Sequence, residues 1–170
     1  MSIRDILLLG NPQLWQLSEI VTDIHSQATQ DLIRDLSETL ASFRATNGFG
    51  RAIAAPQIGA RQRLIYTNVQ GGIALINPVI TTASQEMFTL WDDCFSLPNL
   101  LVRVQRHVEI TVAYSDEQGT AQQLKLQHEL SELLQHEIDH LDGILATDRA
   151  LDQRSFAMRS EIFGRTPASP

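Results

Sequence analysis

Five consecutive residues, His136-Glu137-Ile138-Asp139-His140, form an HExxH motif in the last third of the chain. On an α-helix, residues four apart lie about 40° apart around the axis and one turn along it. His136 and His140 would therefore point the same way and could bind one metal ion through two imidazoles. Glu137 lies on the neighbouring arc, where it could take a proton from a water held by that metal. The motif predicts metal-dependent hydrolysis.

A third ligand is needed, because catalytic metals usually have three protein ligands and one open position. Cys94 is the first candidate, since it is the single cysteine and lies on a loop leaving an extended run. A lone cysteine is also commonly a small buried hydrophobic residue. Glu161 is a rival that would resemble a zinc-protease arrangement, and Asp148 is a weaker one. Spacing alone leaves the choice open.

The helix that carries the motif, residues 128–141, must be largely buried. Its polar face is narrow, because four apolar side chains fill one wide arc: Leu130, Leu134, Ile138 and Leu141. Two imidazoles and a carboxylate beside such an arc would be costly to bury without a partner. A metal ion is such a partner, and Gly143 marks the end of the helix.

Periodicity predicts an α+β fold whose sheets are mostly antiparallel, because hairpins join the strands. An amphipathic helix is expected over residues 26–45, followed by a Gly/Ala-rich loop over 48–59. We expect strands over 64–69, 73–80, 87–91, 100–105, 108–114 and 120–126. A short closing helix is expected over 152–163. The sheets would pack around the HExxH helix.

Size and composition are those of an ordinary globular protein, with 170 residues, 43% of them hydrophobic and 19% charged. We expect one domain over residues 1–164 and a disordered tail over 165–170. A net charge of −7, with no Lys/Arg cluster, argues against nucleic-acid binding. The single cysteine fits a reducing, cytoplasmic compartment, and the apolar run over 6–9 is too short for a signal peptide or membrane span.

Three segments together resemble the motifs of peptide deformylases. Those motifs run G-x-G-[IL]-A-A-P-Q, E-G-C-[LI]-S and Q-H-E-x-D-H-[LI]-x-G. Their counterparts occur in the same order and are Gly50–Gln57 (GRAIAAPQ), Asp92–Ser96 (DDCFS) and Gln135–Gly143 (QHEIDHLDG). The likeness covers nearly the whole chain. It implies a deformylase fold and hydrolysis of the N-formyl group of nascent chains that start with formyl-methionine, releasing formate.

The resemblance also implies roles for individual residues. The positions that match the metal ligands are Cys94, His136 and His140, and Glu137 matches the general acid/base. The donors to the formyl oxygen would be the Gln57 side chain and the backbone N–H of Phe95. Contacts to the substrate are expected from Ala52, Ile53, Phe95 and Leu133. The metal of the family is ferrous iron, which zinc, nickel or cobalt can replace.

Three residues near the expected site depart from the family pattern. Ala52 replaces a glycine and puts a Cβ on backbone that can normally adopt positive φ. Asp92 replaces a glutamate, which shortens a carboxylate that we expect to anchor the cysteine loop. Asp93 replaces the glycine before Cys94 and adds a second carboxylate there, although Asp tolerates left-handed backbone. Arg51 is either a solvated loop charge, the commoner case, or a group that favours an anionic substrate.

Two other hypotheses remain open on the sequence. One is a diverged relative that removes formyl or another small acyl group from a different amine. The other is a non-catalytic relative that keeps the fold to bind nascent chains or another partner. Charges after Gly143 are mixed, which disfavours ribosome docking through a basic terminal helix, although nascent-chain substrates imply transient proximity to ribosomes. The remaining histidines are expected to be structural or surface residues: His25, His107 and His128.

Overall fold

The computed structural model describes residues 3–164, apart from the side chain of Gln70, so the tail expected to be disordered lies outside the described residues. The α-helices of this part are α1 (Gln27–Asn47), α2 (His128–Leu141) and α3 (Arg159–Phe163). Its strands are β1 (Ala52–Ala54), β2 (Leu64–Thr67), β3 (Ile73–Ala83), β4 (Met87–Asp93), β5 (Leu100–His107), β6 (Glu109–Ser115), β7 (Ala121–Gln127) and β8 (Phe156–Met158). Short 3₁₀ turns are η1 (Pro12–Trp15), η2 (Ala55–Ile58), η3 (Val69–Gly71) and η4 (Ala146–Arg149).

The strands form two antiparallel sheets. One has the order β1-β2-β3-β6-β7 and the other has the order β4-β5-β8. Hairpins join β2 to β3, β4 to β5 and β6 to β7, as the alternating sequence indicates. The α+β class and the antiparallel pairing predicted from the sequence are confirmed. Among the described helices, none is long and apolar enough to cross a membrane.

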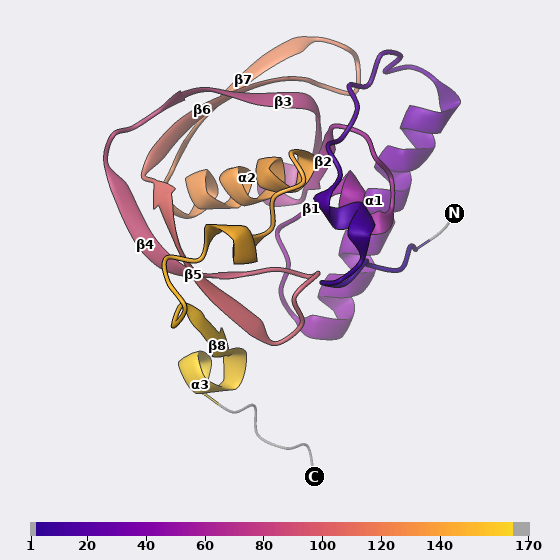
Figure 1. The fold of residues 1–170 in the computed structure, drawn as a ribbon. Helices are drawn as coiled ribbons and strands as arrows, with labels where there is room; N and C mark the ends of the chain where they lie inside the picture. Colours follow the sequence, from indigo (N-terminus) through magenta and orange to yellow (C-terminus); the bar gives the residue numbers. More distant parts are fainter. Residues whose placement is uncertain (1–2, 165–170) are drawn as a thin grey trace.

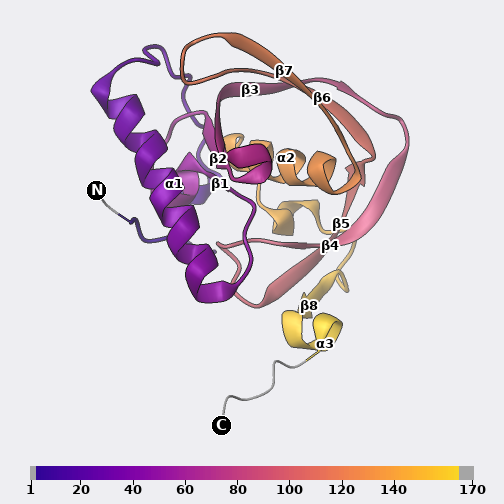
Figure 2. The same cartoon turned by 180° about the vertical axis from the view of Figure 1, so that it is seen from behind.

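Helix α2 lies at the centre of the molecule, between the five-stranded sheet and the β4–β5 hairpin (Figures 1 and 2). Every residue from Ser131 to Leu141 is buried, which agrees with the narrow polar face seen in the sequence. Its apolar arc packs on the larger sheet through a core that includes Ile65, Leu75, Ile110, Val112, Leu133, Leu134, Ile138 and Leu141. Burial of this arc fixes the rotation of α2 and hence the direction in which the two histidines point.

Helix α1 covers the opposite face of the same sheet (Figures 1 and 2). Ser26 caps its N-terminus by accepting a hydrogen bond from the Thr29 N–H, and Gly48 ends it in a left-handed conformation. Strand β1 shows how one strand serves both faces. Ile53 packs toward α1, whereas Ala52 and Ala54 face the core beside α2. Small side chains on that face let α2 approach the strand closely.

Two expected segments differ from the structure. The expected loop over residues 48–59 contains strand β1 and turn η2, and the expected closing helix over 152–163 is the strand β8 followed by a one-turn helix. Both strands have only three residues, too few to show a periodicity. They exist because they pair with longer neighbours, β1 with β2 and β8 with β5. Tertiary pairing therefore overrides local propensity in both places.

Gly143 directs the chain away from α2 by a tight backbone contact. Its φ is +71°, and a Cβ built there would lie 2.6 Å from the carbonyl oxygen of Trp15. Gly48 has a nearly equal φ of +76° but nothing within 4 Å of such a Cβ. The two glycines therefore separate the effect of backbone strain from the effect of crowding.

We expect Gly143→Ala to lower the free energy of unfolding by about 3 kcal/mol, because strain and a clash with fixed backbone add. Gly48→Ala carries the strain alone and should cost about 1 kcal/mol. Urea denaturation followed by circular dichroism measures both values. An equal decrease in the free energy of unfolding for the two variants would show that the backbone at Trp15 moves away from the added Cβ without an energetic cost.

Candidate metal centre

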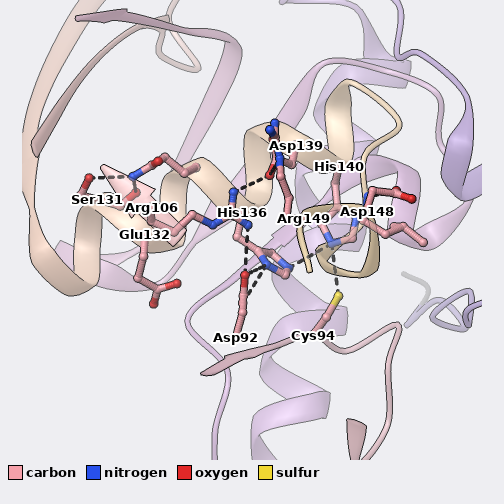
Figure 3. A network of polar contacts seen from close by, with 12 residues as sticks. Asp92, Cys94, Arg106, Ser131, Glu132, His136, Asp139, His140, Asp148 and Arg149 are labelled. Atoms are coloured by element: carbon pink, nitrogen blue, oxygen red, sulfur yellow. Dashed lines mark hydrogen bonds and ion pairs between the residues drawn. The ribbon is translucent and has the colours of Figure 1, made fainter. Parts of the chain in front are cut away.

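Three side chains from distant parts of the chain meet in the interior. Cys94 lies just after β4, while His136 and His140 lie one turn apart on α2. The Cys94 Sγ is 3.2 Å from His140 Nε2, which in turn is 3.1 Å from His136 Nε2. All three residues are buried, and their ligand atoms lie within 4.8 Å of one another. Figure 3 shows Cys94 facing the two imidazoles that hang from α2.

This cluster fits a metal ion by both spacing and chemistry. Ligand atoms around a tetrahedral metal with bonds of 2.0–2.3 Å are separated by about 3.4 Å. Two imidazole nitrogens and a sulfur that converge on one point suit a divalent transition metal. Among the described residues, these three form the one His/Cys/Asp/Glu group with such spacing. The rivals lie elsewhere, because Glu161 is exposed on α3 and Asp148 accepts a hydrogen bond from the Leu145 N–H.

Asp92 orients the first histidine. The Nδ1 of His136 donates to the Asp92 carboxylate at 2.9 Å, which directs Nε2 toward the cluster. Burial opposes ionisation of Asp92, but His136 and Arg106 outweigh burial and lower the pKa of the carboxyl to about 2. The Asp92 carboxylate, shorter than the glutamate of the family motif, was expected to anchor the cysteine loop. Its direct hydrogen-bond partners are instead His136 and Arg106.

The two histidines have opposite electrostatic surroundings. For His136, burial works against protonation, yet the Asp92 carboxylate prevails and raises the pKa of the ring. For His140, burial and the nearby His136 lower the pKa, so this ring is held neutral. A neutral imidazole is the form that binds a metal, so His140 is ready to bind one and a metal ion would displace a proton from His136.

A chain of alternating charges supports Asp92 from behind (Figure 3). Arg106 donates to Asp92 at 3.0 Å and also pairs with Asp139. Asp139 in turn accepts from Arg149 at 2.7 Å, which ties turn η4 to the helix. Arg106 and Asp92 are almost completely buried, with 4% and 3% of their side chains exposed. The buried charges of Asp92, Arg106 and Asp139 are therefore balanced by their neighbours rather than by water.

Glu137 lies in the wall of a cavity of 280 Å³ that opens beside Cys94 and His136. Its side chain is buried, and within the described chain its Oε2 has no hydrogen-bond partner. Burial raises the pKa of Glu137 to about 7, with Asp92 and Glu132 adding to the effect and His136 opposing it. A carboxyl group whose pKa lies close to 7 can both accept and release a proton at physiological pH.

Gln57 presents its amide N–H group to the same cavity. Its Oε1 accepts a hydrogen bond from the Ala54 N–H at 2.9 Å, which fixes the orientation of the amide. The Nε2 therefore faces Cys94 Sγ and Ser96 Oγ, at 3.5 Å and 3.4 Å. Both contacts are long, so this donor is available for a stronger acceptor.

Phe95, directly after Cys94, also lines the cavity. Its ring stacks on Phe43 of α1, with ring centroids 3.9 Å apart. Gly50 permits this arrangement, because a Cβ there would lie 2.9 Å from the ring of Phe95. Within residues 3–164, the backbone N–H of Phe95 makes no hydrogen bond. Helix α1 thus holds the segment that carries a second unused donor.

The three departures from the family pattern leave the cluster intact. Ala52 and Asp93 lie in extended strands, so neither needs the left-handed backbone that their glycine counterparts allow. The concern about positive φ at these positions was wrong. Asp93 points to Arg159, with which it forms an ion pair, rather than into the space between the ligands. That pair links the C-terminal elements to the segment beside Cys94.

The residues expected to contact the substrate fall into two groups. Ala52, Phe95 and Leu133 line the cavity, whereas the side chain of Ile53 is fully buried beneath α1. Arg51 also lines the cavity, and its guanidinium pairs with Glu132. The remaining histidines, His25, His107 and His128, lie outside the cluster of ligand atoms.

Several supporting residues were not recognised from the sequence. Arg106 lies just beyond the strand expected over 100–105, and Asp139 was treated only as a residue of the polar face of the helix. Gln135 received no role, yet its side chain accepts from the His107 N–H at 3.0 Å and donates to the His107 carbonyl at 2.9 Å. It thereby joins α2 to the end of β5. The signal in the sequence was that these residues fall at buried positions of β5 and α2. Periodicity can show that a position is buried, but it does not show which side chain it pairs with.

A thiol and two imidazoles beside a buried glutamate on an HExxH helix define the class of this protein, a metal-binding hydrolase. Comparison with known proteins supplies the family. Residues 3–156 match the model of the polypeptide deformylase family.

Relatives and solved structures agree. The chain is 33% identical to peptide deformylase 1 of Prochlorococcus marinus (strain MIT 9313) over 174 residues, which cover 95% of this chain and 88% of that protein. It is 38% identical to the peptide deformylase of Picosynechococcus, covering 89% of this chain and 86% of the relative. A crystal structure of a peptide deformylase from Synechococcus elongatus in complex with actinonin superposes with a TM-score of 0.81 at 30% identity, covering 90% and 87% of the two chains.

The chain belongs to the polypeptide deformylase family. It is an enzyme of N-terminal processing that removes the N-formyl group from nascent polypeptides. Members of the family use a divalent metal, for which the cluster of Cys94, His136 and His140 is suited.

We expect Arg106→Met to lower the free energy of unfolding by about 3–5 kcal/mol, because Asp92 and Asp139 would be left buried with one partner fewer. Arg103→Met is the matched control, since Arg103 lies on the same strand with an exposed side chain. Urea denaturation of metal-free protein measures both. A loss below 1 kcal/mol for Arg106→Met would mean that water replaces the guanidinium.

We also expect Asp92→Asn to weaken metal binding about 10–100-fold, because His136 would lose the carboxylate that sets its tautomer and orientation. Asp93→Asn is the matched control. It makes the same chemical change, carboxylate to amide, at the neighbouring residue and leaves the hydrogen bond between His136 and Asp92 in place. Competition with a chelating dye gives the affinities of both variants. Equal affinities would contradict the orienting role of Asp92.

Proposed function

We propose that Cys94, His136 and His140 hold the catalytic metal, and that this metal is ferrous iron, with zinc, nickel or cobalt able to replace it. The convergence of the sulfur and two ring nitrogens within 4.8 Å carries the proposal. Their mixed sulfur and nitrogen donors suit these ions better than magnesium or calcium, which prefer oxygen. Asp92 would keep Nε2 of His136 directed at the ion.

The hydrolysis would proceed at the end of the cavity where these groups meet. A bound divalent metal supplies a Lewis acid that makes water a nucleophile near neutral pH. Glu137 accepts a proton from the attacking water as the water oxygen adds to the formyl carbon. The same carboxyl group then delivers that proton to the leaving nitrogen when the C–N bond breaks. The products are formate and a peptide with a free amino group.

Two donors would stabilise the negative charge that develops on the formyl oxygen. One is the Gln57 amide, held in orientation by the Ala54 N–H. The other is the backbone N–H of Phe95, a residue supported by Phe43. Loss of one such donor typically slows a reaction about 10²–10³-fold.

The substrates in this proposal are formyl-methionyl nascent chains, met in the cytoplasm close to the ribosome. A single, buried cysteine agrees with a reducing compartment. Contact with ribosomes would be transient.

The test uses anaerobically purified, iron-loaded protein and a formyl-Met tripeptide, with formate as the product measured. Glu137→Gln should bind as much metal as the wild type but lose at least about 10²-fold in kcat/KM. Cys94→Ser should lose the metal as well, by elemental analysis.

Glu161→Gln removes an exposed carboxylate on α3 and serves as the control, with metal content and activity unchanged. Loss of metal in this variant, with retention in Cys94→Ser, would refute the proposed ligand set. Full metal uptake without release of formate from any formyl peptide would instead favour a binding protein.

A further inference from the structure

The cavity beside the candidate ligands carries an ion pair in its wall. One part of the lining consists of groups proposed to take part in the reaction, namely Gln57, Cys94, His136 and Glu137. Arg51 and Glu132 belong to the same lining and form an ion pair with each other. A substrate whose formyl carbon reaches Glu137 would therefore have its next atoms close to two opposite charges.

Glu132 is fixed in place by the helix that also carries the histidines. It precedes His136 by four residues on α2, so the two side chains share one face of the helix. Figure 3 shows both of them directed to the same side of α2. The reacting end of the cavity and the charged wall are therefore one helical turn apart, about 5.4 Å along the axis. A long first side chain of the substrate can span this distance from the amide nitrogen to its terminal atoms.

The two partners of the ion pair differ in their access to water. The side chain of Glu132 is 9% exposed, whereas that of Arg51 is 40% exposed. Arg51 also donates to the carbonyl oxygen of Glu129 at 3.2 Å, at the start of α2. Burial, with the nearby Asp92, raises the pKa of Glu132, and Arg51 opposes that rise. The carboxylate is the buried, poorly hydrated partner, and Arg51 is the partner that stays in contact with water.

An apolar side chain and a hydrogen-bonding side chain would affect this pair differently. An apolar group that fills the cavity removes the remaining water from the Arg51–Glu132 pair and supplies no replacement, which is costly for charged groups. A side chain with N–H groups replaces that water with a hydrogen bond to a carboxylate, one of the stronger kinds. A second carboxylate would be repelled by the fixed charge of Glu132.

We propose that the Arg51–Glu132 pair determines the side-chain selectivity of this enzyme, and that the cavity accepts formyl peptides whose first side chain carries a hydrogen-bond donor, such as glutamine or lysine, as well as it accepts those that start with methionine. This inference rests on the proposed function, because it assigns the first side chain to the cavity beside the reacting groups. The positive charge of Arg51 is already matched by Glu132, so we do not expect Arg51 to select an anionic substrate.

The test compares four formyl tripeptides that differ only in the first residue, which is methionine, glutamine, lysine or glutamate. The kcat/KM for release of formate is measured with iron-loaded wild-type enzyme. We expect glutamine and lysine to equal or exceed methionine and glutamate to be the poorest. A preference for methionine of about tenfold or more over both glutamine and lysine, or glutamate as the best substrate, would overturn the proposal.

The double variant Arg51→Leu/Glu132→Leu replaces the pair by hydrocarbon and leaves no single buried charge behind. Its ratio of glutamine to methionine turnover should fall about tenfold or more, mainly through KM. Arg61→Leu/Glu19→Leu is the matched control, because it removes an exposed ion pair outside the cavity lining. Its ratio should equal that of the wild type.

Should the double variant fail to fold, Glu132→Gln keeps the shape of the side chain and removes its charge. Its turnover of the lysine peptide relative to the glutamine peptide should be lower than in the wild type, because the carboxylate that would pair with the lysine ammonium is gone. An unchanged set of ratios in a folded and active cavity variant would overturn the specificity proposal and leave the deformylase function standing. Absence of formate release from all four peptides with wild-type enzyme would overturn both.

Discussion

The burial of α2 is the constraint on which the rest of the structure depends. Its central residues are enclosed by strands, yet they include Glu132, His136, Glu137, Asp139 and His140. A buried charge or imidazole without a partner would cost several kcal/mol. The surrounding elements therefore supply charged partners for three of these side chains. Arg51, just before β1, pairs with Glu132, and Asp92 from β4 pairs with His136. Arg106 from β5 and Arg149 from η4 pair with Asp139. The fold and the site are stabilised by the same contacts.

Much of the site could be predicted because its chemistry is encoded locally. The spacing of His136 and His140 on one helix face needs only helical geometry, and the apolar arc of that helix indicates its burial. Cys94 was less certain, since no local rule brings residue 94 to residue 140. Its assignment depended on the likeness of three segments to a known family, and the structure places its sulfur 3.2 Å from His140 Nε2.

The parts that could not be predicted depend on contacts between distant elements. The side chains of Arg106 and Arg149 gave no signal as partners, because their roles exist only once β5 and η4 lie against α2. Strands β1 and β8 were missed for a similar reason, since three residues acquire an extended conformation by pairing with a neighbour. The ion pair that Asp93 forms could not be predicted either, because its partner, Arg159, lies 66 residues further along the chain.

The order of the site residues along the chain has a consequence for biosynthesis. Gln57 and Cys94 are translated first, but the helix with both histidines follows only after all strands of the larger sheet. A ribosome-bound chain can thus pair those strands while the surface that α2 will cover is still open to water. Premature termination before codon 140 would yield a product without the second imidazole, however complete its sheet. Quality control that recognises uncovered apolar strands would find such products readily.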